Sequence, residues 1–203
     1  MSSLREAQKQ LTRDTIIERA LELFTAKGYA ATTIDEIAGA AGTTRVTFYA
    51  YYPSRTDLMK DFMARVNAVL DRAAGPGSTS TAADLVDVVR IGELPGILAW
   101  LESRSALWPV FRPYLDVLDE AAAVDPDVRA LMEAWHEEVI SDMVRGMALA
   151  GRFTPETHHI RGTLAYTQLD YVATLWTRRK FEPNREQALD VLADSWYHLL
   201  CDG

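Results

Sequence analysis

The chain has 203 residues, of which 48 % are hydrophobic and 25 % charged, proportions that are typical of a globular protein and exclude global disorder. No run of eighteen apolar residues occurs, the polar N-terminus lacks the apolar stretch of a secretory signal, and the single cysteine, Cys201, cannot form an internal disulfide. We therefore expect a cytoplasmic protein without a membrane span. The formal net charge of −8 argues against nucleic acid, but residues 1–60 hold eight Lys and Arg against seven Asp and Glu, so the acidity belongs to the remainder.

The first two elements are expected to be helices. The first begins with Thr12 as N-cap and continues to about Lys27, where Gly28 permits a left-handed stop. Its apolar residues recur at helical spacing: Ile16, Ile17, Ala20, Leu21 and Phe24. The second helix begins at Thr33, because residues 33–36 fit the capping-box pattern.

Two further helices are expected before a clear break in the chain. Gly42 permits a tight turn, after which Thr44 caps a short helix that continues to about Tyr51. Ser54 caps a fourth helix that continues to about Ala74. The segment Gly-Pro-Gly-Ser-Thr-Ser-Thr at 75–81 then predicts a connection without regular structure.

The remainder of the chain also predicts helices and no strand, so the fold class is all-α. Asp125-Pro126, Thr154-Pro155 and the box at 184–187 are helix starts, and Gly151 is a stop. The expected helices are 82–91, 95–106, 109–123, 126–150, 155–179 and 184–201.

The short third helix separates its side chains into two faces. Phe48 and Tyr52 lie four residues apart and are expected in the core. A different face carries a cation, a branched apolar side chain, hydroxyls and a phenol, which are groups that contact phosphates, base edges and thymine methyls in a DNA major groove. The residues of this second face are Arg45, Val46 and Tyr49, flanked by Thr47 and Tyr51. A short helix on a tight turn is typical of a helix-turn-helix, here at about 33–52.

Residues 12–62 resemble the DNA-binding domain of TetR-family regulators. The matching motifs occur in the family's order and cover about a quarter of the chain: Gly28-Tyr29, Thr32-Thr33, Ile37-Ala38, Thr47-Phe48-Tyr49 and Tyr52-Pro53-Ser54-Arg55.

The resemblance implies roles for individual residues. Thr33 and Thr44 cap their helices and donate to phosphates, although threonine before a helix is first of all a cap. Arg45 and Thr47 match positions that reach bases or phosphates, and Tyr49 matches a phosphate-binding tyrosine. These assignments depend on the motif, because an arginine outside it is ordinarily a solvated side chain.

Two more positions complete the predicted DNA-binding set, together with Tyr51. Arg55 matches a basic residue that holds the DNA backbone at the start of the fourth helix. Val46 departs from the family pattern, which often has a smaller residue or proline there. Its side chain either contacts a thymine methyl or limits close approach, so the sequence preference stays open.

The C-terminal two-thirds is rich in large aromatic residues and lacks a comparable motif. The resemblance implies a helical domain that encloses a small-molecule pocket and forms a dimer, whereas the plainer interpretation of these aromatics is a hydrophobic core. The candidate ligand-binding residues are Trp100, Trp108, Phe111, Tyr114, Trp135, His136, Tyr166, Gln168, Asp170 and Tyr171.

The last two helices, 155–179 and 184–201, are the implied dimer interface, and packing within one chain is the alternative. Their apolar residues are Leu164, Leu169, Val172, Leu175, Leu189, Leu192, Trp196 and Leu199. A dimer also suits a palindromic operator, because symmetry doubles the contacts of one short helix.

No pattern predicts a metal site, a cofactor or catalysis. His158 and His159 point about 100° apart on a helix and no further ligand completes a site. Cys201 stands at the chain end without an activating motif. The chain is therefore not expected to be an enzyme.

The predicted architecture is a DNA-binding domain at 1–53 and a helical ligand-binding and dimerisation domain at 54–203, whose first helix links the two. The predicted function is a sequence-specific transcriptional regulator, a repressor that a small apolar ligand releases from DNA. The alternatives are a helical protein-interaction module without DNA binding, which the acidic charge favours, and a helical enzyme.

Overall fold

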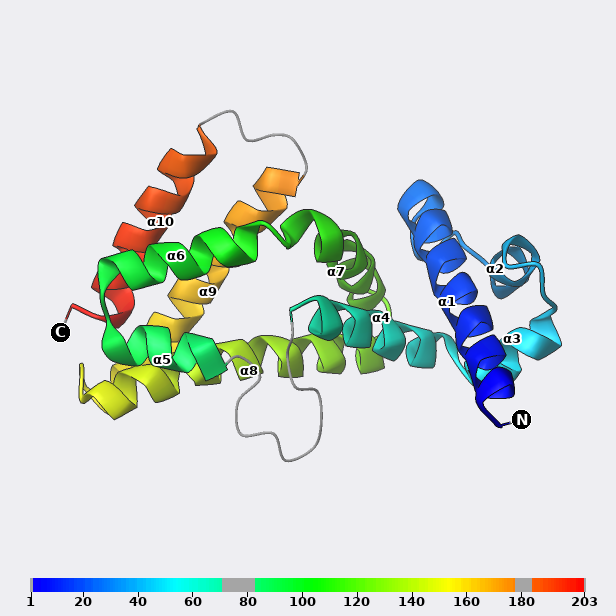
Figure 1. The fold of residues 1–203 in the computed structure, drawn as a ribbon, viewed down its shortest axis with the longest axis horizontal. Coiled ribbons are helices and arrows are strands. Elements are labelled where there is room, and N and C mark those ends of the chain that lie inside the picture. The colour runs from blue at the N-terminus through cyan, green and yellow to red at the C-terminus, as the bar shows by residue number, and fades with distance from the viewer. Residues whose placement is uncertain (1, 71–82, 178–183, 203) are drawn as a thin grey trace. The chain divides into compact units, whose positions relative to one another are not determined.

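The computed structural model describes residues 2–70, 83–177 and 184–202. These residues form ten α-helices and no strand, so the predicted all-α fold is confirmed (Figure 1). The helices are α1 (Ser2–Lys27), α2 (Ile34–Ala40), α3 (Arg45–Tyr51), α4 (Arg55–Val69), α5 (Ala83–Ile91), α6 (Leu94–Ser105), α7 (Trp108–Ala122), α8 (Pro126–Ala150), α9 (Pro155–Thr177) and α10 (Arg185–Leu200).

Most predicted helix boundaries agree with the structure. The six helices expected beyond residue 82 correspond to α5 to α10, and their boundaries within the described residues agree to about one residue. The predicted start at 82 and the predicted end at 179 lie outside the described residues. Gly28 and Gly151 have φ of +86° and +65° directly after α1 and α8, which confirms both predicted stops. The break predicted at 75–81 and the helix end predicted at Ala74 lie outside the described residues.

The predicted start of the first helix is wrong. Helix α1 begins at Ser2, and Thr12 lies inside it, where its hydroxyl donates to the carbonyl oxygen of Gln8 at 3.0 Å. A threonine hydroxyl has two such options, the cap and the carbonyl four residues earlier. Here the residues before Thr12 are strong helix formers such as Glu, Ala, Gln, Lys and Arg, so the helix extends through them.

By contact, the chain divides into two compact units. The first comprises Met1–Val66 and Pro113–Met132, and the second comprises Asn67–Arg112 and Glu133–Gly203. In the first unit, α2 packs against α1 and α3. Its largest fully buried side chains lie between the start of α1 and the end of α4: Ile16, Ile17, Phe24, Ile37, Phe48, Tyr52, Leu58, Met59 and Phe62.

Residues 113–132 are bound to the helix-turn-helix region within this first unit. The Glu120 carboxylate accepts a hydrogen bond from the backbone N–H of Tyr29 at 2.9 Å, and the Asp125 carboxylate accepts one from the Thr56 hydroxyl at 3.0 Å. The Tyr114 ring packs edge-on against Phe62 with 5.3 Å between ring centroids. These contacts join residues that lie between 52 and 91 positions apart in the sequence.

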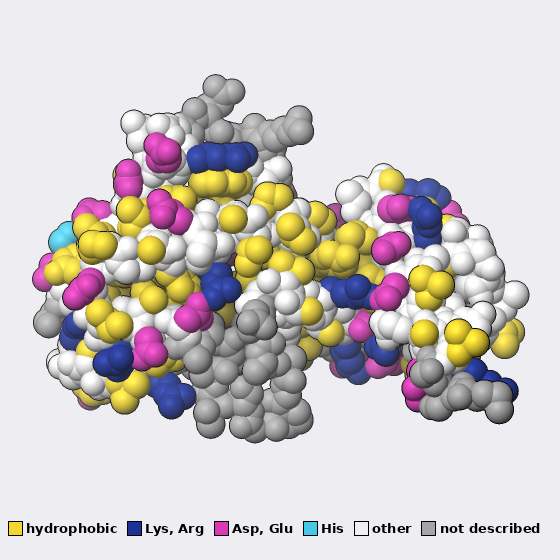
Figure 2. Space-filling model, in the orientation of Figure 1, with side chains coloured by type: hydrophobic (Ala, Val, Ile, Leu, Met, Phe, Trp, Pro, Cys, Tyr) yellow, Lys and Arg dark blue, Asp and Glu magenta, His cyan; other side chains and the backbone are white. Residues whose placement is uncertain are grey.

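In the second unit, α10 packs against α6 and α9, and α5 packs against α6 (Figure 1). Trp108 and Trp196 are its largest fully buried side chains, and the Trp196 indole donates to the Ala165 carbonyl oxygen at 3.1 Å. Apolar side chains such as Ile91 and Leu94 remain exposed over α5 and α6, interspersed with acidic ones (Figure 2). No described helix is long and apolar enough to cross a membrane.

Candidate nucleic-acid interface

The turn between α2 and α3 is fixed by backbone geometry. Gly42 has φ of +66°, a conformation that a residue with a Cβ rarely adopts, and the Thr43 N–H donates to the Ala38 carbonyl oxygen at 2.9 Å. The Thr44 hydroxyl then accepts the Thr47 N–H at 3.1 Å and caps α3, as predicted. These contacts hold α3 at a fixed angle to α2, as a helix-turn-helix requires.

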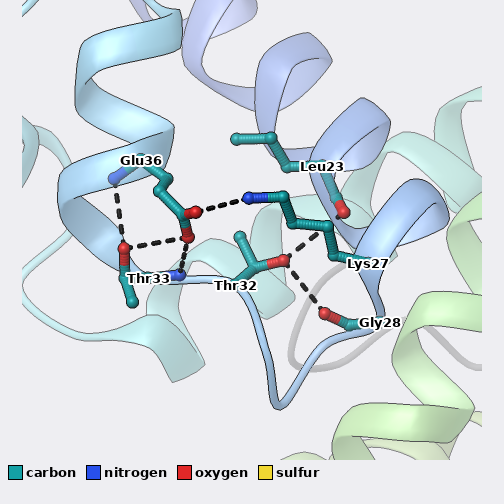
Figure 3. Close-up of polar contacts among 6 residues, drawn as sticks. All are labelled: Leu23, Lys27, Gly28, Thr32, Thr33 and Glu36. Atoms are coloured by element: carbon teal, nitrogen blue, oxygen red, sulfur yellow. Dashed lines mark hydrogen bonds and ion pairs between the residues drawn. The ribbon is translucent and has the colours of Figure 1, made fainter.

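The predicted capping box at the start of α2 is confirmed. The Thr33 hydroxyl accepts the Glu36 N–H at 3.2 Å, and the Glu36 carboxylate accepts the Thr33 N–H at 2.9 Å (Figure 3). Lys27 forms an ion pair with the same carboxylate. Hydrogen bonds from Lys27 and from the Thr33 backbone lower the pKa of Glu36 to about 2.

The hydroxyl of Thr33 is already engaged within the chain. It lies 3.0 Å from Glu36 Oε2, so its proton points to that carboxylate while its oxygen accepts the cap hydrogen bond (Figure 3). The neighbouring Thr32 is buried, and its hydroxyl donates to the Gly28 carbonyl oxygen at 2.9 Å. The structure therefore assigns both threonines to the joint between α1 and α2, and a phosphate contact by Thr33 stays a prediction.

The two faces predicted for α3 are present. Phe48 and Tyr52 are 0 % and 1 % exposed, which places them in the core as expected. On the other face, Val46 is 80 % and Tyr49 39 % exposed, and the Arg45 side chain is 59 % exposed. This helix therefore presents a cation, a methyl-bearing side chain and a phenol to solvent together.

Arg45 is held by two neighbours on this surface. Its guanidinium forms an ion pair with Asp35 of α2 at 3.0 Å and lies over the Tyr49 ring, 5.6 Å from the centroid. The negative charge of Asp35 raises the pKa of Arg45. Asp35 carries no sequence signal as a site residue, because it lies ten residues from Arg45 on the other side of a turn, and no local pattern relates two such positions.

The other predicted DNA-binding residues divide between this surface and a contact with Tyr29. Thr47 lies beside the exposed face, with its hydroxyl 3.0 Å from that of Thr44, and Tyr51 is half-buried at the end of α3. Arg55 does not belong to the group of exposed residues on α3. Its guanidinium donates to the Tyr29 carbonyl oxygen and lies 3.9 Å from the centroid of the Tyr29 ring.

A partly buried polar network fixes the end of α3 against its neighbours. The Tyr52 hydroxyl donates to Asp61 of α4 at 2.6 Å, and the same carboxylate forms an ion pair with Arg13 of α1 at 2.6 Å. Burial and the hydrogen bond to Asp61 raise the pKa of Tyr52. The sequence analysis placed Tyr52 in the core but missed its partners, which lie 9 and 39 positions away.

Five of the ten candidate ligand-binding residues meet in the second unit. A cavity of about 80 Å³ is lined by aliphatic side chains, by Arg104 and by these five aromatics: Trp100, Trp108, Phe111, Trp135 and Tyr166. Arg104 was not among the predicted ligand-binding residues, although its position four residues after Trp100 on a helix is a signal for a shared face. The indole of Trp135 donates to Asn67 Oδ1 at 2.9 Å, which fixes one wall.

The other five candidates are placed elsewhere. Tyr114 belongs to the first unit, Tyr171 is 63 % exposed, and Gln168 accepts a hydrogen bond from the Ser195 hydroxyl at 3.0 Å. The Asp170 carboxylate pairs with the buried Arg112 at 2.7 Å. The His136 ring packs against Tyr166 with 5.1 Å between centroids, and burial lowers the pKa of His136.

One face of α9 remains apolar and exposed. Ile160, Leu164 and Tyr171 are 55 %, 47 % and 63 % exposed and lie four and seven residues apart, which places them on one side of the helix. Trp196 of α10, predicted as an interface residue, is 0 % exposed and belongs to the core of its own chain. The apolar spacing of α10 could not distinguish these two roles.

Comparison with known proteins identifies a family from the N-terminal part of the chain. Residues 16–62 match the family model described as bacterial regulatory proteins, tetR family. The chain is 29 % identical over 126 residues to the HTH-type transcriptional repressor LfrR of Mycolicibacterium smegmatis, covering 59 % of this chain and 65 % of LfrR. It is 32 % identical over 103 residues to the HTH-type transcriptional regulator TcmR of Streptomyces glaucescens, covering 46 % of each.

Solved structures share the fold over nearly the whole chain. NalD, the secondary repressor of the MexAB-OprM multidrug efflux pump in Pseudomonas aeruginosa, superposes with a TM-score of 0.66 at 21 % identity, covering 94 % of this chain and 98 % of NalD. A TetR-like regulator from Rhodococcus gives a TM-score of 0.62 at 18 % identity over 93 % of each chain. The matched segments span about two thirds of LfrR and about half of TcmR, and the match to the family model lies in the N-terminal part of the chain.

Proposed function

Because this chain belongs to the TetR family of bacterial regulatory proteins, we propose that it is a sequence-specific DNA-binding regulator of transcription in the bacterial cytoplasm. The observation that carries the proposal is the outer face of α3. Arg45, Val46 and Tyr49 are exposed together there, while Phe48 and Tyr52 anchor the helix in the core. We assign DNA binding to residues 1–53, with no catalytic role.

The proposed regulator acts as a homodimer on a palindromic operator. The exposed apolar face of α9 supports this, because three large apolar side chains on one helix face are the kind of centre that a protein interface needs. We assign dimerisation and ligand binding to residues 54–203. Symmetry places two copies of α3 on two half-sites, which doubles the base contacts of a seven-residue helix.

The proposed control is repression that an apolar ligand relieves. The aromatic cavity of the second unit supports this part of the proposal. At about 80 Å³ it is smaller than a cavity of about 150 Å³ that holds benzene. A ligand must therefore displace the surrounding side chains, and such a displacement can favour a protein state with weaker DNA binding.

Selection of duplex DNA from a random library, followed by mobility-shift titration at several salt concentrations, tests the DNA-binding proposal. Wild type should enrich a palindromic sequence, and its affinity should fall as salt rises. Absence of binding even at low salt would support the interaction module instead.

Replacement of Tyr49 by Phe tests the placement of the DNA-binding face. The change keeps the ring beneath Arg45 and removes the hydroxyl, so affinity for the enriched sequence should fall several-fold with an unchanged circular dichroism spectrum. The matched control is Tyr197→Phe, since Tyr197 is a partly exposed tyrosine on α10, outside both the first unit and the apolar face of α9. Equal affinity of wild type and Tyr49→Phe would contradict the placement.

A further inference from the structure

We propose that the cavity of the second unit binds aromatic molecules that carry a carboxylate or similar anionic oxygen, and that Arg104 binds this group. The inference deepens the ligand control proposed above and names the chemical class of the ligand. It starts from the composition of the cavity wall. Five aromatic and several aliphatic side chains line the cavity, and Arg104 is the only charged residue among the described lining residues.

The guanidinium of Arg104 has one buried donor that remains unpaired. Its Nε is shielded from solvent and has no hydrogen-bond partner among the described residues, whereas Nη1 donates to the Leu70 carbonyl oxygen at 3.2 Å. A buried N–H group without an acceptor is costly, and an oxygen atom of a ligand would satisfy it. Because Nε is closed off from the cavity as well as from solvent, a ligand oxygen reaches it only when the surrounding side chains shift, as the small volume of the cavity already requires.

The charge of Arg104 is only partly compensated. Its counter-ion, Asp84, is 47 % exposed, whereas the Arg104 side chain is 22 % exposed, so the cation lies deeper than the anion. The Asp84 carboxylate also accepts hydrogen bonds from the Trp100 indole and the Leu85 N–H, both at 3.0 Å. Because Asp84 has these other partners, Arg104 can interact with a second anion.

An anionic oxygen fits this environment better than a neutral one. Hydrogen bonds between two charged groups are shorter and stronger than neutral ones, and apolar walls strengthen the attraction further by excluding water. The flat aromatic walls favour a planar ring for the remainder of the ligand. The competing interpretation is a purely structural role for Arg104. Its guanidinium would then only donate to the Leu70 carbonyl oxygen and lie over the Trp100 ring, 5.5 Å from the centroid.

Calorimetric titration of the full-length protein with benzoate and with benzamide, its neutral counterpart of the same size, tests the proposal. Wild type should bind benzoate at least about tenfold more tightly than benzamide. Arg104→Gln should abolish the preference, and Asp84→Asn should increase benzoate affinity because a competing anion is removed. Arg90→Gln, which breaks an exposed ion pair with Asp87 on the same helix as Asp84, is the matched control and should change neither value.

Arg104→Gln and Asp84→Asn are expected to have opposite effects on benzoate binding, which distinguishes a ligand-binding role of Arg104 from a structural one. If the Arg104–Asp84 ion pair were only structural, both variants would lower the melting temperature and neither would alter the preference for benzoate. If Arg104→Gln fails to fold, Arg104→Lys keeps the charge, lacks the planar fork and should retain a reduced preference for benzoate. Equal binding of benzoate and benzamide to wild type, or binding of neither, would overturn the proposal.

DNA release is measured in the same samples, so that this inference and the proposed ligand control fail separately. Benzoate binding with the expected variant pattern but without DNA release would support the carboxylate site and contradict the ligand control. Release of DNA by benzamide but not by benzoate would support ligand control and overturn the carboxylate site.

Discussion

Arg45 illustrates how single residues combine roles in the proposed interface. An isolated arginine side chain has many rotamers, and ordering it on DNA costs conformational entropy. Here the ion pair with Asp35 and the ring of Tyr49 hold the guanidinium before DNA is present. The remaining guanidinium donors can then form the bidentate contact by which arginine reads guanine.

Replacing Asp35 by Asn should separate affinity from specificity. The change removes a negative charge beside the DNA surface, so affinity for unrelated DNA should rise, while the loosened Arg45 should lower the preference for the operator. Protein stability should change by less than about 0.5 kcal/mol, because exposed ion pairs contribute little. Titrations with operator and unrelated DNA give the measurement, and an operator preference that is unchanged or increased would contradict this role.

Arg45→Ala should reduce operator binding by about 1–3 kcal/mol if the side chain reads a base, with little effect on unrelated DNA. Uniform weakening of all sequences, with a smaller dependence on salt, would instead assign Arg45 to a phosphate. Mobility-shift titration of both DNAs at three or more salt concentrations distinguishes these results.

Arg55 is a predicted DNA-binding residue that also has contacts within its own unit, and its phosphate contact stays a prediction. Its guanidinium contacts the carbonyl oxygen and ring of Tyr29, whose N–H is bound by Glu120. We therefore expect Arg55→Gln to destabilise the first unit by about 1 kcal/mol, as measured by chemical denaturation. Its DNA binding should keep the salt dependence of wild type. A reduced salt dependence with normal stability would instead support the predicted contact of Arg55 with a DNA phosphate.

At the scale of elements, α9 and α10 carry similar apolar spacing but are buried to different degrees. Leu189, Leu192 and Trp196 are 6 %, 4 % and 0 % exposed, so this face of α10 is filled by its own chain. The Ile160–Leu164–Tyr171 face of α9 is open. A partner subunit is therefore expected to contact α9 at these residues, and Trp196 is expected to stabilise the fold.

Leu164→Asp should convert the proposed dimer to a monomer, because it places a charge at the centre of the apolar face of α9. Sedimentation velocity at micromolar concentration provides the measurement. Leu149→Asp, at a 60 % exposed leucine of α8, is the matched control and should remain dimeric. A wild type that sediments as a monomer would contradict the interface.

At the scale of the whole molecule, the proposed control requires thermodynamic coupling between two sites. A ligand that lowers DNA affinity must itself bind more weakly, by the same factor, when DNA is present. Typical coupling of about 1–3 kcal/mol corresponds to a 5- to 150-fold change in each constant. Measuring both dissociation constants with a ligand that binds the cavity checks the prediction, and unequal factors would rule out a simple equilibrium mechanism.

Local sequence was sufficient for the features that depend on neighbouring residues. Helical periodicity, the Thr33 and Thr44 caps and the stops at Gly28 and Gly151 depend on groups a few residues apart, so they could be predicted. The two faces of α3 followed from the same spacing. Only the start of α1 was misplaced, because Thr12 can serve either as a cap or inside a helix.

Tertiary structure decided which of several chemically suitable side chains share a site. An arginine in the family motif, Arg55, is turned to Tyr29, whereas Arg104, in no motif, reaches the aromatic cavity. Both outcomes depend on contacts between segments tens of residues apart, which periodicity does not encode. Sequence determines how each helix forms and which faces are apolar, but the packing of helices against one another determines which of those faces remain open to DNA, ligand or a second subunit.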